Sequence, residues 1–219
     1  MQPDVSPEVS KRYVQYGCGL SSPEGWINYD SSPTLKIQRL PLVGSVLKPF
    51  LNVTFPPAVL FGDIVTGLPE SPGSVDGVYC SHVLEHLALD DLRVALKNTA
   101  TIMKPGAVFR MVLPDLEWLA RNYIKELENG NTAAAVSFVE GTLMGLHKRP
   151  RGLKQQMSAM FGNSHHLWMW DHESLSAELK GAGFRNIRRS KFGDAADPAF
   201  KKVEDENRFH QAVSLECTR

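Results

Sequence analysis

The sequence predicts an α/β fold in which a doubly wound, mostly parallel sheet forms a single domain. Apolar residues alternate along the chain between strand-like and helix-like spacing, which is typical of parallel strands joined by crossover helices. The glycine turn Gly17-Cys18-Gly19 follows the first predicted strand, and the second predicted strand ends on Asp30. In an open α/β sheet, a glycine turn and an acid at these places line a nucleotide-binding crevice.

The composition is that of an ordinary globular protein of 219 residues, with 42% hydrophobic and 22% charged residues. Lysine plus arginine equal aspartate plus glutamate at 24 each, so no overall field attracts nucleic acid or an anionic membrane. The basic clusters 147–151 and 185–191 are expected to be solvated faces. Three widely spaced cysteines and a first segment without a signal peptide lead us to expect a cytoplasmic protein with reduced thiols.

The apolar segment 40–61 is the one stretch that invites a membrane interpretation. Lys48, Asn52 and four prolines interrupt it, so it is shorter than the unbroken apolar length that a span requires. We expect no membrane span, and we assign residues 36–58 to an insertion in the domain.

The predicted elements begin with four short strands. Their β-branched and aromatic residues favour strands, and glycine, proline or polar residues follow each one. The strands cover residues 13–16, 26–29, 58–61 and 75–80.

A helix is then expected from an N-cap at Asp90, with an apolar stripe that includes Leu92 and Leu96, to a stop at residues 104–106. The next strand covers 107–113, and Pro114 is placed in the first turn of the helix that follows.

The remaining elements complete the sheet. Residues 132–170 form a helical or lid segment, and Asp171 caps a helix through Leu179. Closing strands are expected at 184–187 and 212–215, the last antiparallel.

Ordered motifs along the chain resemble class I S-adenosylmethionine-dependent methyltransferases of the methyltransferase-11-like type, which carry a short glycine motif. The motifs are YGCG, GWINYD, GDIVTGLPESPGSVDGVYCSHVLEHL, MKPGAVFRMVLPDLEWL and SLSAELKGAGFRNI. The resemblance implies a Rossmann-like fold, the cofactor S-adenosyl-L-methionine, and methyl transfer to an oxygen or nitrogen of a small-molecule or sugar-like acceptor. A non-catalytic cofactor-binding scaffold is the alternative.

The resemblance also implies roles for residues at the first two strand ends. Gly17 and Gly19 match the turn that lies against the methionine part of the cofactor, and Tyr16, directly before that turn, is included in the binding set. Asp30 matches the acid that holds both ribose hydroxyls. Gln15 replaces an acid found in many members of the family.

At the third and fourth strand ends, Asp63 and Ile64 match the position that receives the adenine. Ser81 and His82 match the floor beneath the sulfonium. His82 is also a candidate general base, as is Asp115 just past the fifth strand, although Asp115 can simply cap its helix.

The connection from Gly19 to Asp30 contains about ten residues, fewer than a crossover with a full helix normally uses. We therefore expect the first helix to be vestigial or replaced by a loop. The loss of its amino end weakens the site for the cofactor carboxylate.

The motif His82-Val83-Leu84-Glu85-His86 spells H-x-x-E-H, the pattern of one group of zinc hydrolases. That pattern needs both histidines on one helix, but His82 directly follows a strand, and no downstream glutamate stands out as a third ligand. We expect no metal and a structural role for Glu85 and His86. The segment 165–171 is either a lid that offers a histidine base or a packed cap with histidines facing solvent.

Overall fold

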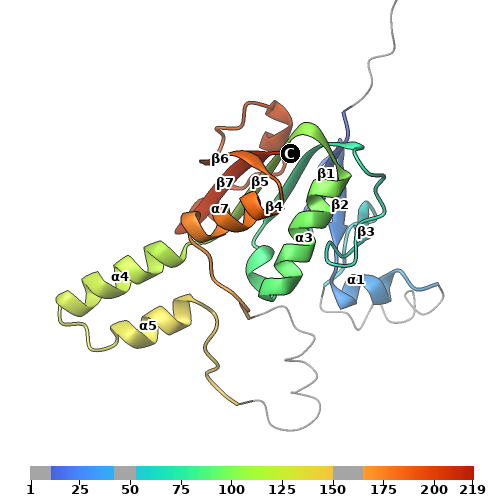
Figure 1. Ribbon diagram of the computed structural model, residues 1–219. Helices are drawn as coiled ribbons and strands as arrows, with labels where there is room; N and C mark the ends of the chain where they lie inside the picture. Colours follow the sequence, from blue (N-terminus) through green and yellow to red (C-terminus); the bar gives the residue numbers. More distant parts are fainter. Residues whose placement is uncertain (1–10, 42–52, 150–164) are drawn as a thin grey trace, which may run out of the picture.

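The computed structural model describes residues 11–41, 53–149 and 165–219, and in it seven strands form one sheet in the order β3-β2-β1-β4-β5-β7-β6 (Figure 1). The strands are β1 (Tyr13–Tyr16), β2 (Trp26–Asp30), β3 (Val59–Phe61), β4 (Val75–Ser81), β5 (Met103–Pro114), β6 (Arg185–Arg189) and β7 (Ala212–Thr218). The first five run parallel, and β7 is antiparallel to both β5 and β6. The predicted doubly wound, Rossmann-like sheet with an antiparallel last strand is confirmed.

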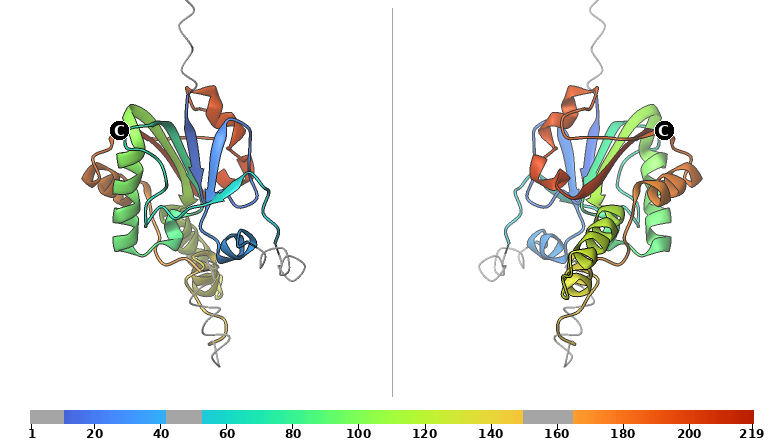
Figure 2. Two further views of the ribbon diagram at one scale, coloured as in Figure 1. Left: turned by 90° about the vertical axis from the view of Figure 1, so that its right-hand side faces the viewer. Right: turned by 90° about the vertical axis from the view of Figure 1, so that its left-hand side faces the viewer.

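The main core lies between one face of the sheet and the helices α3 (Leu89–Ile102) and α7 (His172–Gly181) (Figure 2). Leu92 and Leu96 of α3 and Leu175 of α7 are fully buried there. Burial of one apolar stripe per helix against a sheet face is the main stabilising term of such a layer.

Two predicted helix boundaries are wrong. Ala88, not Asp90, is the N-cap of α3, and it makes no side-chain capping bond. Asp90 lies in the first turn, where a carboxylate still favours the helix dipole. Pro114 is the last residue of β5, which begins directly after α3 and runs through residues 104–106.

The connection between β1 and β2 holds no helix, as the sequence predicted. The other face of the sheet is covered instead by the segment between β6 and β7, which we call the covering segment. It contains the short 3-10 helices η3 (Pro198–Lys202) and η4 (Glu206–Phe209) (Figure 2). Phe200 packs with Tyr13 and Trp26 in a second core, and Trp26 Nε1 donates to the carbonyl of Ala199 at 3.1 Å.

Arg110 of β5 binds the covering segment to the sheet through ion pairs. Its guanidinium is almost fully buried and forms ion pairs with Glu204, Asp194 (3.0 Å) and Glu216 (2.5 Å). Because these acids come from the segment and from β7, the buried charge ties the covering layer to the sheet.

After β5, the helices α4 (Leu116–Glu128) and α5 (Ala134–Gly141) form a hairpin that projects from the sheet (Figure 1). Within the described part of the expected helical or lid segment 132–170, the helix covers only Ala134–Gly141. A short helix, α1 (Pro33–Gln38), follows β2, and the 3-10 helix η2 (Leu84–His86) follows β4. Residues 42–52 of the expected insertion and 150–164 of the expected lid lie outside the described residues.

Among the described helices, none combines the length and the apolar character that a membrane span requires.

Candidate functional site

A cavity of about 530 Å³ opens at the carboxyl ends of the parallel strands. Five residues predicted for the site line it together, from the ends of β1, β2, β3 and β4: Gly17, Asp30, Asp63, Ile64 and His82. The other lining residues are Ser31, Pro33, Val65, Val83, His86, Leu87 and Asp91.

Of the two glycines in the predicted turn, Gly17 lines this cavity and Gly19 does not. Gly17 and Gly19 have φ of +65° and +56°, a conformation that residues with a Cβ rarely adopt. A Cβ on Gly17 would overlap Val83 Cγ2, whereas a Cβ on Gly19 would meet open space. The N–H of Gly19 donates to Asp30 Oδ2 at 2.9 Å, so the turn also orients the acid at the end of β2.

Two carboxylates are fixed by backbone N–H groups. Ser32 donates to Asp30 Oδ1 at 2.8 Å, and Val65 donates to Asp63 Oδ1 at 2.8 Å. A carboxylate oxygen can accept a second hydrogen bond, so both groups keep acceptor capacity for a ligand. Ile64 is 5% exposed and gives the cavity an apolar side next to Asp63.

A second, smaller cavity of about 190 Å³ shares Gly17 with the first. It contains Ser81, whose hydroxyl is buried without a partner, and Tyr16. The ring of Tyr16 lies in the core, and its hydroxyl contacts Thr99 Oγ1 at 3.3 Å. Tyr16 can therefore offer a ligand only its backbone.

The covering segment supplies Lys202, Glu204, Asp205 and Arg208 to the smaller cavity. The sequence analysis missed these residues because the run KKVEDENR mixes both charges and matches no motif. On the opposite wall, the amide of Gln15 donates to Asn28 Oδ1 at 2.5 Å.

Asp115 lines neither of these two cavities. It is the N-cap of α4, and its Oδ1 accepts from the N–H of Glu117 at 2.9 Å. The side chain thus has the capping role that the sequence analysis gave as the alternative to catalysis.

His82 lies directly after β4 with φ of +54°, an unusual conformation for a residue with a side chain. Its Nε2 lies 3.0 Å from the carbonyl oxygen of Arg208, and its Nδ1 lies 3.2 Å from Glu85 Oε1. Burial lowers the pKa of His82, but these two contacts outweigh burial and leave the pKa above its ordinary value.

Beyond His82, the H-x-x-E-H motif does not form the helical pair of a zinc hydrolase, because η2 begins only at Leu84. Glu85 is 1% exposed, and His166, a histidine outside the motif, lies close to it. One ligand atom each of Glu85, His86 and His166 lies within 4.8 Å of the others. Burial lowers the pKa of His166, and Glu85 offsets only part of this effect.

The segment 165–171 is divided between core and solvent. Trp170 is buried, and Trp168 is 41% exposed. Asp171 caps α7, as predicted, and it forms a capping box with Ser174.

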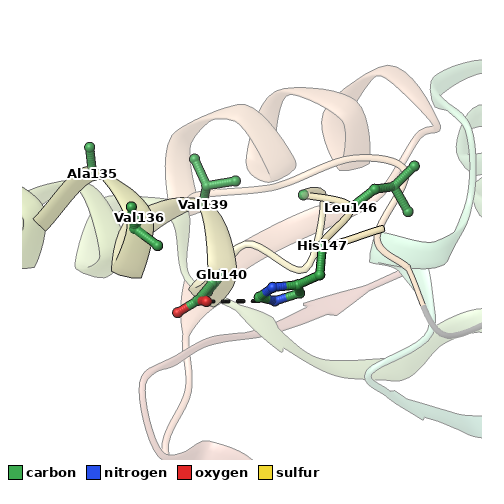
Figure 3. Close-up of a pocket in the computed structure, with 7 residues that line it drawn as sticks. Ala135, Val136, Val139, Glu140, Leu146 and His147 are labelled. Carbon is green, nitrogen blue, oxygen red and sulfur yellow. Dashed lines mark ion pairs between the residues drawn. The ribbon is translucent and has the colours of Figure 1, made fainter. Parts of the chain in front are cut away.

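A further groove, of about 400 Å³, lies along α5 and away from the strand ends (Figure 3). Val136, Val139 and Leu146 give it an apolar surface, and His147 lies 3.5 Å from Glu140 at its edge. It holds none of the predicted site residues.

Comparisons with known proteins were made for the whole chain. The family model described as a methyltransferase domain matches residues 5–189. A search of curated proteins finds no match.

Among solved structures, a SAM-dependent methyltransferase from Archaeoglobus fulgidus is similar over 96% of this chain and 87% of its own, with 15% identity and a TM-score of 0.48. A SAM-dependent methyltransferase from Thermotoga maritima is similar over 98% and 84%, with 18% identity and a TM-score of 0.48. The phosphoethanolamine N-methyltransferase 2 of Haemonchus contortus, in complex with S-adenosyl-L-methionine, is similar over 96% and 49%, with 11% identity and a TM-score of 0.47.

Proposed function

The chain belongs to the methyltransferase domain family as a class I S-adenosylmethionine-dependent methyltransferase, and on this premise we propose that it methylates an oxygen or nitrogen of a small-molecule or sugar-like acceptor. Its cofactor is S-adenosylmethionine. The observation that carries the proposed cofactor site is the meeting of Gly17, Asp30 and the pair Asp63-Ile64 in one cavity, although three separate segments of the chain supply them.

We assign the adenosine part of the cofactor to the larger cavity. Asp30 would accept hydrogen bonds from both ribose hydroxyls, since each of its oxygens now holds only one backbone N–H. Asp63 would accept from the exocyclic amine of adenine, and Ile64 would pack on the ring.

We assign the methionine part to the smaller cavity, across the shared Gly17. The missing first helix cannot offer its amino end to the carboxylate, but Lys202 and Arg208 bring cationic groups to the same place, where Glu204 is paired with Arg110 and Asp205 caps η4. The covering segment would thus replace the lost helix in binding as well as in packing. Ser81, with its unpartnered hydroxyl, would face the polar end of the cofactor.

Methyl transfer is an in-line displacement in which orientation supplies much of the rate. We propose that His82 acts as a positioning residue beside the transferred methyl group. Both of its ring nitrogens are occupied, by the Arg208 carbonyl and by Glu85, so it is poorly placed to take a proton from the acceptor. Asp115 would act on the acceptor only by fixing the start of α4.

The test is calorimetric titration of the protein and of Asp30→Ala with S-adenosylmethionine and its demethylated product. Loss of hydrogen bonds from the ribose to a charged acceptor costs about 2–4 kcal/mol, so we expect affinity to fall roughly 30- to 1000-fold. Asp91→Ala is the matched control, because it removes another carboxylate from the same cavity. Circular dichroism verifies that each variant is folded.

Equal cofactor affinity of Asp30→Ala and Asp91→Ala would contradict the proposed ribose site. Incubation of the wild-type protein with labelled cofactor and panels of small alcohols, sugars and amines then identifies the acceptor class.

A further inference from the structure

Glu85, His86 and His166 form a buried cluster beside the larger cavity that the methyl-transfer proposal does not use. Glu85 is 1% exposed and His166 is 6% exposed. Oε2 of Glu85 and Nδ1 of His166 are buried without a hydrogen-bond partner, whereas Oε1 of Glu85 lies 3.2 Å from Nδ1 of His82. Buried polar groups are nearly always paired, and a buried carboxylate oxygen without a partner is especially unfavourable.

A hydrogen bond to the main chain determines which ring nitrogen of His86 carries the proton. Nδ1 of His86 lies 3.0 Å from the carbonyl oxygen of His165, and a carbonyl can only accept, so this nitrogen carries the proton. In the neutral ring, Nε2 of His86 is then a free acceptor. A histidine that donates one ring N–H to a backbone carbonyl while its other nitrogen is free is the usual arrangement of a metal ligand.

Main-chain bonds hold His166 in place against Glu85. The N–H groups of Leu167 and Trp168 both donate to the carbonyl of Glu85, at 2.8 Å and 3.1 Å. The N–H of His166 donates to the carbonyl of Leu143 at 3.3 Å. These main-chain bonds bring the ligand groups together, and the rings of His86 and His166 also pack edge to face, with their centroids 5.0 Å apart.

We propose that Glu85, His86 and His166 bind a divalent transition metal ion. Two imidazole nitrogens and one carboxylate are a donor set suited to Zn²⁺ and to other first-row ions such as Fe²⁺ or Co²⁺, and they leave positions open for water or substrate. His86 also lines the larger cavity, so an open position there can hold an oxygen or nitrogen of the acceptor. The sequence analysis expected no metal because it considered only the histidine pair of the motif and a downstream glutamate, whereas the third ligand here, His166, is a histidine 80 residues beyond His86.

The experiment uses the full-length protein, freed of metal with a chelator and titrated with Zn²⁺, Co²⁺ or Mg²⁺ salts without S-adenosylmethionine. We expect one Zn²⁺ per chain by elemental analysis, visible d–d absorption on Co²⁺ addition, and no response to Mg²⁺. Glu85→Gln and His166→Gln should weaken Zn²⁺ binding by more than the roughly 10- to 100-fold caused by loss of a hydrogen bond to a ligand.

His147→Gln is the control, because His147 forms an exposed pair with Glu140 and lies outside the cluster. It should bind Zn²⁺ like the wild type. Absence of stoichiometric Zn²⁺ and Co²⁺ uptake by the wild type would overturn the proposal without any variant, and so would unchanged affinity in folded Glu85→Gln and His166→Gln. Because the titrations contain no cofactor, their outcome does not depend on the proposed methyl transfer.

Discussion

Replacement of Gly17 by alanine tests how closely the glycine turn packs on the loop after β4. The backbone has φ of +65°, which costs an alanine about 1–2 kcal/mol. The new methyl group would also lie 3.3 Å from Val83 Cβ and Cγ1 and would overlap Cγ2. Overpacking of this kind costs about 1–3 kcal/mol, so Gly17→Ala should lower the free energy of unfolding by about 2–5 kcal/mol.

Gly19→Ala is the matched control, because Gly19 has nearly the same φ, +56°, and open space around its Cα. Gly19→Ala should lower the free energy of unfolding only by the cost of the left-handed backbone conformation, about 1–2 kcal/mol. Any loss of chain entropy in the unfolded state is common to both variants and cancels in the difference.

Urea unfolding followed by circular dichroism gives both free energies, with similar slopes expected if unfolding stays two-state. In a double-mutant cycle, Val83→Ala should restore the steric part of the Gly17→Ala loss, which appears as a coupling energy of about 1–3 kcal/mol. If Gly17→Ala and Gly19→Ala are equally stable and no coupling appears, the close packing on Val83 is refuted.

Two further predictions concern the layer that covers the sheet. Arg110→Met should lower the free energy of unfolding in urea by about 3–5 kcal/mol, because it leaves the buried carboxylate of Glu204 unpaired. Arg93→Met, at an exposed ion pair, is the control and should lower the free energy of unfolding by less than about 1 kcal/mol. Equal losses would show that the buried network does not stabilise the layer. Burial raises the pKa of Asp194, but hydrogen bonds from Arg188 and Arg110 outweigh it and hold the pKa below its ordinary value. Its stabilising contribution should be complete above about pH 4 and disappear as the pH falls through the lower native pKa, so the acid-induced fall in melting temperature should be shallower in Asp194→Asn.

The strands could be predicted because their signals are local. The alternation of apolar residues placed β1, β2, β4 and β5 within a few residues, and Asp30 and Asp63 lie at strand ends that a parallel sheet brings together. The start of α3 could not be predicted from Asp90, because the N-cap lies two residues earlier, at Ala88, and makes no side-chain capping bond.

The parts that escaped prediction depend on packing between distant segments. Lys202 and Arg208 reach the smaller cavity only because residues near the end of the chain occupy the face left bare by the missing first helix. His166 meets Glu85 only because two main-chain N–H groups anchor its neighbours to the carbonyl of Glu85. Neither contact leaves a periodic pattern or a spaced motif in the sequence.

The covering segment also sets the order in which the binding crevice can be completed during folding. Its bonds to the first two strands, Tyr13 to Asp197 and Trp26 to Ala199, join residues 184 and 173 positions apart. Contacts of such high sequence separation pay a large loop-closure entropy and form slowly. A ribosome-bound chain that has already paired β1, β2 and β4 therefore still lacks one wall of the crevice. Cofactor binding then indicates that the covering segment has packed onto β1 and β2.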